Sequence, residues 1–596
     1  MLTRTMRRFF LYGIGCSGRT AGPRAGSGRR PVFPIPMEYG GFGRYYSRHS
    51  CAGGGRFGGD SPRDWHKRRE ASRPDSVACL FQTSRISCYY QPANRMRHRI
   101  LLAAAFVYLC VSNLVWIALD TRPPFWDMAA HQSGALRILN AVGAEGLLGL
   151  ARVPSLTLPY PPLYHSVVAI FYAVFGKTVD AAQYANLPAI LILLLATYGI
   201  GRTVLTPVGA AFSAVLVSFY PMLLWLSRET LIDYWLTGMV TLAIWALLRT
   251  KRFSHTGWTI AFGVVAGMGV LTKWTFPFFV ALPFLWFARG NWKKAAAAVG
   301  IVALIGAFWY LPAWPALLEL LRINSGHALA KGDPERWSWQ ALIFYIRVLE
   351  GYQIFLPLFA ALIAGAGILA RRFTEPWAPI VLWIAGGWAG LLLFQNKDPR
   401  YSAPLLPALA LITANVVERR QVLIAPIMAL LAFQHYLVSF GVRQLPQTVV
   451  LAKGVEGPLS WDWNVYSQQY HALWGPPARE DWRIEHVLGK VSSAGGPPVR
   501  LAVVPEIPRF DSSAFQFYAT LGNFPVSVSR LYTPGDAAAN SDYILISERD
   551  QGPRYIAPDA TAVNDYILSR PERFEVLERF PLPNGDIIRL YKVGHS

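Results

Sequence analysis

Long apolar runs dominate the middle of the chain. Between residues 99 and 440 they recur, many at about 18 to 20 residues, which is enough for a helix to cross a hydrocarbon core of about 30 Å. The pattern predicts about eleven membrane-spanning helices, at 99–119, 182–201, 207–226, 232–249, 256–271, 274–288, 295–313, 352–370, 377–395, 401–418 and 421–440. A further apolar stretch, 161–176, is short and opens with two prolines, so we expect it to lie on the membrane surface or to re-enter.

Basic residues between the predicted spans fix which side of the membrane each loop faces. If 161–176 does not cross and the N-terminus is inside, every cytoplasmic loop is basic, as the positive-inside rule requires. These loops carry Arg202; Arg249, Lys251 and Arg252; Arg289, Lys293 and Lys294; Arg371 and Arg372; and Arg419 and Arg420. If 161–176 crosses, all of them fall outside. We therefore expect the first arrangement, which puts the C-terminus outside the cytoplasm.

The pattern changes after residue 440, where long apolar runs end. Strand-like pieces (VRLAVV at 499–504 and DYILIS at 542–547) alternate with helical pieces (SSAFQFYATLG and TAVNDYILSR), and a final hairpin turns on Asn584–Gly585. The sequence predicts a mainly α protein: a transmembrane helical bundle at 99–440 and a small extracytoplasmic α/β domain at 441–596.

The first 98 residues differ from the rest. Residues 1–99 hold 19 Lys and Arg against five Asp and Glu, or about +14 of the net charge of +22, and the first 98 residues show no helical or strand period. We expect 1–98 to be a disordered basic leader, or sequence upstream of a start at Met96. The remaining charge is ordinary for a membrane protein, so we expect no nucleic-acid partner. Four of the five cysteines lie in the leader and the fifth is Cys110, so no outer disulfide is expected.

An acid and an imidazole follow the first span, in RPPFWDMAAH. Asp127 and His131 are spaced i, i+4, so on a helix they share one face and can hold one metal ion or substrate. The alternative is an ordinary capped amphipathic helix.

The other polar residues between spans gather at the same outer rim. Tyr160, Tyr164 and His165 border the surface stretch, Arg228 and Asp233 follow the third span, and Lys273 follows the fifth. Arg228 and Lys273 also fit snorkelling at span ends, whereas Asp233 lies among Leu, Ile, Tyr and Trp, where an acid usually marks a functional site.

A short polar turn, NKDPRY, lies between the ninth and tenth predicted spans. It contains Lys397, Asp398 and Arg400. Asp-Pro is typical of tight turns, but two cations beside the outer head groups also suit a phosphate or pyrophosphate.

Five segments in this order resemble the polyprenyl-phosphate-sugar-dependent glycosyltransferases of GT-C fold, in the branch akin to protein O-mannosyltransferases and aminoarabinose transferases (the RgtA/B/C/D-like group). The segments are RPPFWDMAAH, PYPPLYHSVVAIFYAVFG, LSRETLIDYWLTGMVTLAIWALL, VLTKWTF and KDPRYSAPLLPALAL. The resemblance implies that Asp127 is the catalytic base or a metal-associated group, and that Asp233, the second predicted catalytic residue, lines the same cavity. The family often has a second acid directly after the first; here that position is Met128, which leaves Asp127 and His131 as the candidate ligands of a divalent metal ion.

The implied reaction is transfer of one sugar from a polyprenyl-phosphate donor to a hydroxyl of a glycan, lipid or protein acceptor, at the outer face of a bacterial cell membrane. His131, Tyr160, Tyr164, His165, Arg228, Lys273, Lys397, Asp398 and Arg400 are the expected substrate-binding residues. An in-line displacement would invert the anomeric centre. The alternatives are a transporter or flippase of a lipid-linked saccharide, an oligosaccharide ligase, and a non-catalytic membrane scaffold.

Overall fold

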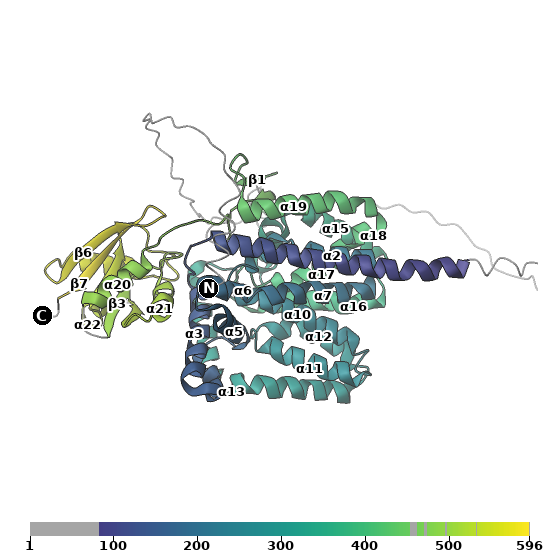
Figure 1. The fold of residues 1–596 in the computed structure, drawn as a ribbon, viewed down its shortest axis with the longest axis horizontal. Helices are drawn as coiled ribbons and strands as arrows, with labels where there is room; N and C mark the ends of the chain where they lie inside the picture. The colour runs from purple at the N-terminus through teal and green to yellow at the C-terminus, as the bar shows by residue number, and fades with distance from the viewer. Residues whose placement is uncertain (1–82, 453–461, 470–473, 495–497, 532, 595–596) are drawn as a thin grey trace, which may run out of the picture. The chain divides into compact units, whose positions relative to one another are not determined.

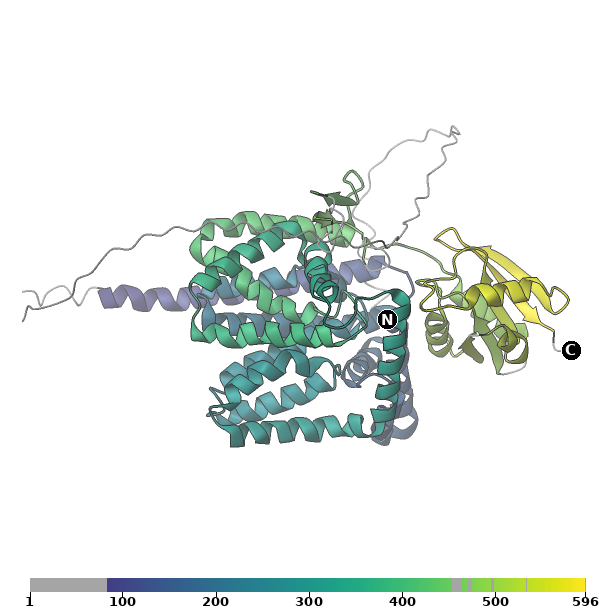
Figure 2. The same ribbon diagram turned by 180° about the vertical axis from the view of Figure 1, so that it is seen from behind.

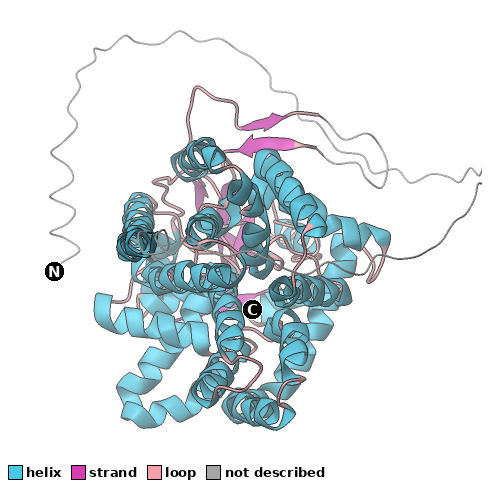
Figure 3. Cartoon of the chain, turned by 90° about the vertical axis from the view of Figure 1, so that its right-hand side faces the viewer, coloured by secondary structure: helices cyan, strands magenta, loops and turns pink. Residues whose placement is uncertain are grey.

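Helices make up most of the described chain, with one larger sheet near its C-terminal end (Figure 3). The computed structural model describes residues 83–452, 462–469, 474–494, 498–531 and 533–594. Most of the predicted leader, residues 1–82, lies outside this part. The first described helix begins at Thr83.

The helices of the first half are α2 (Thr83–Leu119), α3 (Asp127–Glu145), η1 (Gly146–Arg152), α4 (Val153–Leu156), α5 (Leu163–Phe175), α6 (Val179–Tyr184), α7 (Leu187–Val204), α8 (Pro207–Ser218), α9 (Pro221–Leu226) and α10 (Ile232–Arg249). The predicted span 207–226 is not one helix. The chain breaks at Phe219–Tyr220 and restarts at Pro221, because proline lacks the N–H that would continue the helix but suits a first turn.

The helices that follow are α11 (Thr256–Val270), α12 (Phe276–Ala288), α13 (Trp292–Lys331), α14 (Trp339–Val348), the π-helical turn η2 (Leu349–Ile354), α15 (Phe355–Arg371), η3 (Glu375–Trp377), α16 (Ala378–Leu393), η4 (Ala403–Leu405), α17 (Leu406–Thr413), α18 (Asn415–Arg419), η5 (Gln421–Leu423) and α19 (Ile424–Phe440). Helix α13 extends well beyond the predicted 295–313.

Seven helical stretches within the described residues are long and apolar enough to cross a membrane, so the predicted number of eleven spans stays a prediction. One of the seven, Asp127–Leu156, was not among the predicted spans. Its main helix α3 runs crosswise to α2 and α7 (Figures 1 and 2) and packs against α5, which at 13 residues is too short to cross. This arrangement suits two helices at the membrane surface.

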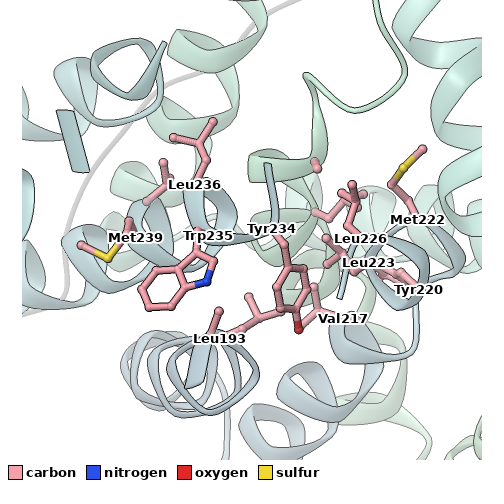
Figure 4. Packing of buried hydrophobic residues seen from close by; sticks show 14 of the residues in the cluster. Leu193, Val217, Tyr220, Met222, Leu223, Leu226, Tyr234, Trp235, Leu236 and Met239 are labelled. Carbon is pink, nitrogen blue, oxygen red and sulfur yellow. The ribbon is translucent and has the colours of Figure 1, made fainter. Parts of the chain in front are cut away.

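The core of the bundle is packed by side chains of α7, α8, α9 and α10 (Figure 4). Tyr234 and Trp235 follow Asp233 directly and are both buried, and the Trp235 indole donates a hydrogen bond to the Ala185 carbonyl at 3.0 Å. These contacts fix the first turn of α10. They therefore also fix the position of Asp233.

The C-terminal part contains a short ribbon, β1 (Thr448–Val450) with β2 (Asn464–Ser467), and a five-stranded sheet. The sheet has the order β4 (Val526–Arg530), β3 (Val499–Val503), β5 (Tyr543–Ser547), β7 (Ile587–Val593), β6 (Phe574–Pro581). Strand β3 pairs in parallel with β4 and β5, and β7 is antiparallel to β5 and β6.

Four helices accompany the sheet: α20 (Ile484–Ala494), α21 (Ser512–Leu521), α22 (Pro534–Ala539) and α23 (Ala560–Leu568). The strands predicted at 499–504 and 542–547 and the two predicted helices are confirmed. So is the hairpin, whose Gly585 has φ +84°, a conformation that glycine adopts without a steric cost.

Candidate active site

Asp127 is the first residue of α3, where the positive end of the helix dipole favours a carboxylate. Its Oδ2 accepts a hydrogen bond from Arg400 Nη2 at 3.2 Å, and the Tyr160 hydroxyl lies 3.5 Å from its Oδ1. Its side chain is 44% exposed, against 14% for Arg400. Asp127 is thus held in place by two neighbours while its carboxylate stays accessible.

Arg400 lies in the loop between α16 and η4 and joins Asp127 to Asp398. Its Nε and Nη2 both lie 3.0 Å from the Asp398 carboxylate, whose Oδ1 also accepts the Arg400 backbone N–H at 2.9 Å. Burial raises the pKa of Asp398, but the Arg400 guanidinium outweighs it and brings that pKa to about 2. Asp398 therefore stays charged and fixes Arg400, as a tight Asp-Pro turn allows.

A second ion pair lies beside the first. Lys273, between α11 and α12, donates a hydrogen bond to Asp233 Oδ1 at 2.7 Å, and the Lys273 and Asp233 side chains are only 8% and 2% exposed. The Lys273 ammonium also lies 4.6 Å from the ring centre of Tyr401, the residue that follows Arg400. Arg400 interacts electrostatically with both Asp127 and Asp233. The structure thus brings five of the predicted charged residues into one cluster: Asp127, Asp233, Lys273, Asp398 and Arg400.

A cavity of about 240 Å³ opens next to this cluster. Asp233, Lys273 and Tyr401 form a polar end, and most of the remaining wall is apolar or aromatic, with Leu236, Trp274, Phe278, Phe279, Tyr345, Leu391 and Phe394. A site of this kind, apolar with a few convergent polar groups, suits a ligand with an apolar body and a charged head.

Glycines let helix α16 approach α12 closely at the cavity wall. A Cβ on Gly387 would lie 2.5 Å from Phe279 Cδ1, and one on Gly390 would lie 2.5 Å from Phe278 Cβ. Small residues commonly serve this purpose where membrane helices pack.

His131, Tyr164 and His165 form a buried wall behind Tyr160 rather than part of the cavity lining. His131 Nδ1 lies 3.1 Å from His165 Nε2, and the His131 ring packs edge-on against Tyr160. His131, Tyr164 and His165 are each at most 2% exposed. These three side chains support the position of Tyr160. Because they are buried and do not line the cavity, the geometry does not favour direct contact between them and the substrate.

The candidate metal pair does not converge on a common point. His131 turns a ring nitrogen toward His165, and Asp127 is paired with Arg400. In the described part of the chain, no group of three or more His, Cys, Asp or Glu side chains could hold a metal ion. These residues do not fit a divalent metal, and no step of the mechanism is assigned to one.

Two predicted substrate ligands have structural partners instead. Arg228 is buried and donates to Asn113 Oδ1 at 3.0 Å and to Ser439 Oγ at 2.6 Å, so it links α2 to α19. Lys397 is fully buried and donates to the carbonyls of Leu391 and Phe394 at the end of α16. Burial lowers the pKa of Lys397 to about 8. Neither the Arg228 guanidinium nor the Lys397 ammonium lines the cavity, so neither residue is assigned to the site.

Tyr401, Tyr345 and Arg336 are among the cavity residues that were not predicted from the sequence. Tyr401 follows Arg400 directly, so its place in the same turn was a usable signal. Tyr345 and Arg336 also line the cavity, but they lie in and before α14, which the apolar pattern did not predict.

Comparisons with known proteins identify the fold of the chain. Residues 160–314 match the family described as dolichyl-phosphate-mannose-protein mannosyltransferase. The structure of ArnT from Cupriavidus metallidurans in the apo state superimposes with a TM-score of 0.53 at 16% identity, over 84% of this chain and 98% of ArnT. The chain has the fold of ArnT. The ArnT structure bound to undecaprenyl phosphate gives a TM-score of 0.51 at 14% identity, over 82% of this chain and 97% of that one.

Sequence relatives agree with the ArnT fold. An undecaprenyl phosphate-α-4-amino-4-deoxy-L-arabinose arabinosyl transferase of Pseudomonas savastanoi pv. phaseolicola is 25% identical over 358 residues, which is 54% of this chain and 62% of the relative. A second such transferase, from Proteus mirabilis, is 22% identical over 41% of this chain and 46% of its own length. The chain thus spans less than two thirds of these curated relatives. The predicted resemblance to GT-C glycosyltransferases is confirmed, and the chain is an integral membrane protein.

Proposed function

We propose that this protein is a membrane glycosyltransferase that moves one sugar from a polyprenyl-phosphate donor to a hydroxyl of a glycan, lipid or protein acceptor. The observation that carries the proposal is the accessible Asp127 carboxylate, which Arg400 connects to the Asp233–Lys273 pair at the polar end of an apolar cavity. The relatives named for undecaprenyl-phosphate-linked sugar transfer, and the ArnT structure with undecaprenyl phosphate, support the donor class.

The donor would lie with its lipid against the aromatic cavity wall and its phosphate near Lys273 and Arg400. Both cations are fixed by acids, Lys273 by Asp233 and Arg400 by Asp398. Cations held in place before the reaction stabilise charge that develops in the transition state. In this scheme Asp233 does not touch the reacting atoms but positions Lys273. Arg336, at the exposed edge of the cavity, would meet the phosphate as the donor enters.

Asp127 would act as the general base. It takes the proton of the acceptor hydroxyl, the hydroxyl oxygen bonds to the anomeric carbon, and the bond from that carbon to the phosphate oxygen breaks. The electron pair leaves with the lipid phosphate, whose charge Arg400 and Lys273 offset. Displacement from the side opposite the phosphate inverts the anomeric centre. The basic loops between spans support a reaction on the outer face, with the C-terminal sheet on the same side.

The test is transfer of radiolabel from a panel of undecaprenyl-phosphate sugars, with native membrane extract as acceptor, by the purified full chain. The wild type is compared with Asp127→Asn and with Glu145→Gln. Glu145 lies at the other end of α3, in an exposed ion pair with Arg152, so it is a matched control.

We expect transfer by the wild type and by Glu145→Gln, and a loss of ~10²–10⁴-fold in Asp127→Asn, the usual contribution of a general base. Equal transfer by Asp127→Asn would contradict the assigned base. Binding or flipping of a donor by the wild type without transfer would favour the transporter instead.

A further inference from the structure

The segment that leads into Asp127 is held by residues from the C-terminal part of the chain. Thr121 N–H donates to the Ala478 carbonyl at 3.0 Å, and Ala478 N–H donates to Asp120 Oδ1 at 3.0 Å. Further along, Arg509 Nη1 donates to the Pro123 carbonyl at 3.3 Å. Residues 120–123 are therefore fixed from outside the helical bundle.

The last of these contacts is made by Asp511, and it holds Trp126, the residue directly before Asp127. Asp511 Oδ1 accepts the Trp126 backbone N–H at 3.2 Å. The same oxygen accepts the N–H groups of Ser513 and Ala514 at 3.0 and 3.1 Å, so Asp511 is also the N-cap of α21. Asp511 is fully buried, and α21 packs directly against α3.

Trp126 has an unusual backbone conformation at this point. Its φ is +44° and its ψ is −120°. Bulky residues rarely adopt this backbone conformation, and it persists only where the surrounding structure holds it. Its carbonyl accepts the Ala130 N–H at 2.9 Å in the first turn of α3. The conformation of Trp126 thus sets where α3 begins and in which direction Asp127 points.

We propose that Asp511 is a positioning residue for Asp127. It holds Trp126 in the left-handed conformation and so keeps the Asp127 carboxylate opposite Arg400 and Tyr160. The inference rests on the proposed function for its catalytic consequence, and it gives the C-terminal sheet a defined part in the site: its helix α21 supplies the acceptor that fixes the base.

Substitutions at 511 can separate the contact between Asp511 and Trp126 from the N-cap of α21. A serine at 511 can still cap α21 with its hydroxyl, but it is too short to reach Trp126 as well. Asparagine has the shape of aspartate and keeps the shared acceptor. Burial and the nearby Glu506 raise the pKa of Asp511 well above its usual range, so a neutral side chain suits this position.

Ser512→Ala provides the matched control. Ser512 is the first residue of α21, and its hydroxyl donates to Glu506 Oε1 at 2.6 Å. Loss of this hydrogen bond weakens the first turn of α21 but leaves the contact between Asp511 and Trp126. The full chain carrying Asp511→Ser, Asp511→Asn or Ser512→Ala is compared with the wild type. The readouts are kcat and KM for the undecaprenyl-phosphate sugar donor, and amide hydrogen exchange of peptides covering residues 121–130.

We expect Asp511→Ser to lower kcat by ~100-fold with KM unchanged, the effect typical of a misplaced catalytic group, and to speed exchange in 121–130. Asp511→Asn and Ser512→Ala should match the wild type in kcat and in the rate of amide exchange in 121–130. Wild-type kcat in Asp511→Ser, unchanged exchange in 121–130, or an equal loss of kcat in Ser512→Ala would each overturn the proposal. If the wild type transfers no sugar, the proposed function fails, and hydrogen exchange alone still decides whether Asp511 holds this segment.

Discussion

The Asp233–Lys273 pair makes the sharpest prediction about the cavity. Lys273→Met removes the ammonium and leaves the Asp233 carboxylate, with only 2% of its side chain exposed, inside the protein. Across the described ranges, Lys273 is the one side chain that donates a hydrogen bond to this carboxylate. Breaking a buried ion pair in this way costs about 3–5 kcal/mol, because the remaining carboxylate loses its hydrogen-bond donor and keeps only the electrostatic interaction with Arg400.

The double variant Asp233→Asn/Lys273→Met separates stability from activity. With both charges removed, most of the lost stability should return, since a neutral pair of similar volume has little desolvation penalty. Sugar transfer should not return, because the cavity then lacks the ammonium beside Tyr401. The free energy of unfolding is measured by SDS titration in mixed micelles, and transfer by release of label from the donor.

Two results would refute this reasoning. A loss of less than about 1 kcal/mol in Lys273→Met would mean that the pair is solvated rather than buried. Wild-type transfer by the double variant would mean that the charged end of the cavity has no part in binding the donor phosphate.

Three further predictions concern other parts of the molecule. Tyr160→Phe removes the hydroxyl near Asp127 and should lower kcat about fivefold, roughly 1 kcal/mol, in the transfer assay. Gly134→Ala places a Cβ 2.6 Å from the His165 ring and should destabilise the bundle by about 1–3 kcal/mol in SDS titration. Glu548 accepts hydrogen bonds from two arginines, which lower its pKa from 4.5 to about 2. Its stabilising effect is therefore complete above pH 4.5 and lost as the pH falls toward 2, so near-UV circular dichroism should show a shallower acid transition for Glu548→Gln.

The fold was predictable wherever the local pattern alone decides the structure. The apolar run at 232–249 has the same bounds as α10, and the alternating pieces at 499–504 and 542–547 coincide with β3 and β5. The pattern did not predict the length of the helical stretch at 127–156, and it failed at 207–226, where Pro221 divides one apolar run into two helices.

The candidate site was predictable only in part, because a charged side chain acts through partners that are often distant in sequence, as Arg400 is from Asp127. Asp127, Asp233, Lys273 and Arg400 do lie together. Lys397, in contrast, lies three residues before Arg400 yet caps the end of α16, and local sequence does not show which carbonyls a lysine will reach.

Asp511 shows the same limit more strongly. Its partner Trp126 is 385 residues away, and nothing in the sequence around Asp511 distinguishes it from an ordinary N-cap. Only the packing of α21 on α3 connects the two.

In the proposed mechanism Asp127 performs the chemistry rather than binding the donor. Rapid-quench single-turnover transfer and equilibrium binding of the undecaprenyl-phosphate sugar, measured on the wild type and Asp127→Asn, test it most directly. We expect an unchanged donor Kd and a transfer rate ~10²–10⁴-fold lower in Asp127→Asn. A transfer rate equal to that of the wild type, or a loss explained entirely by weaker donor binding, would contradict it.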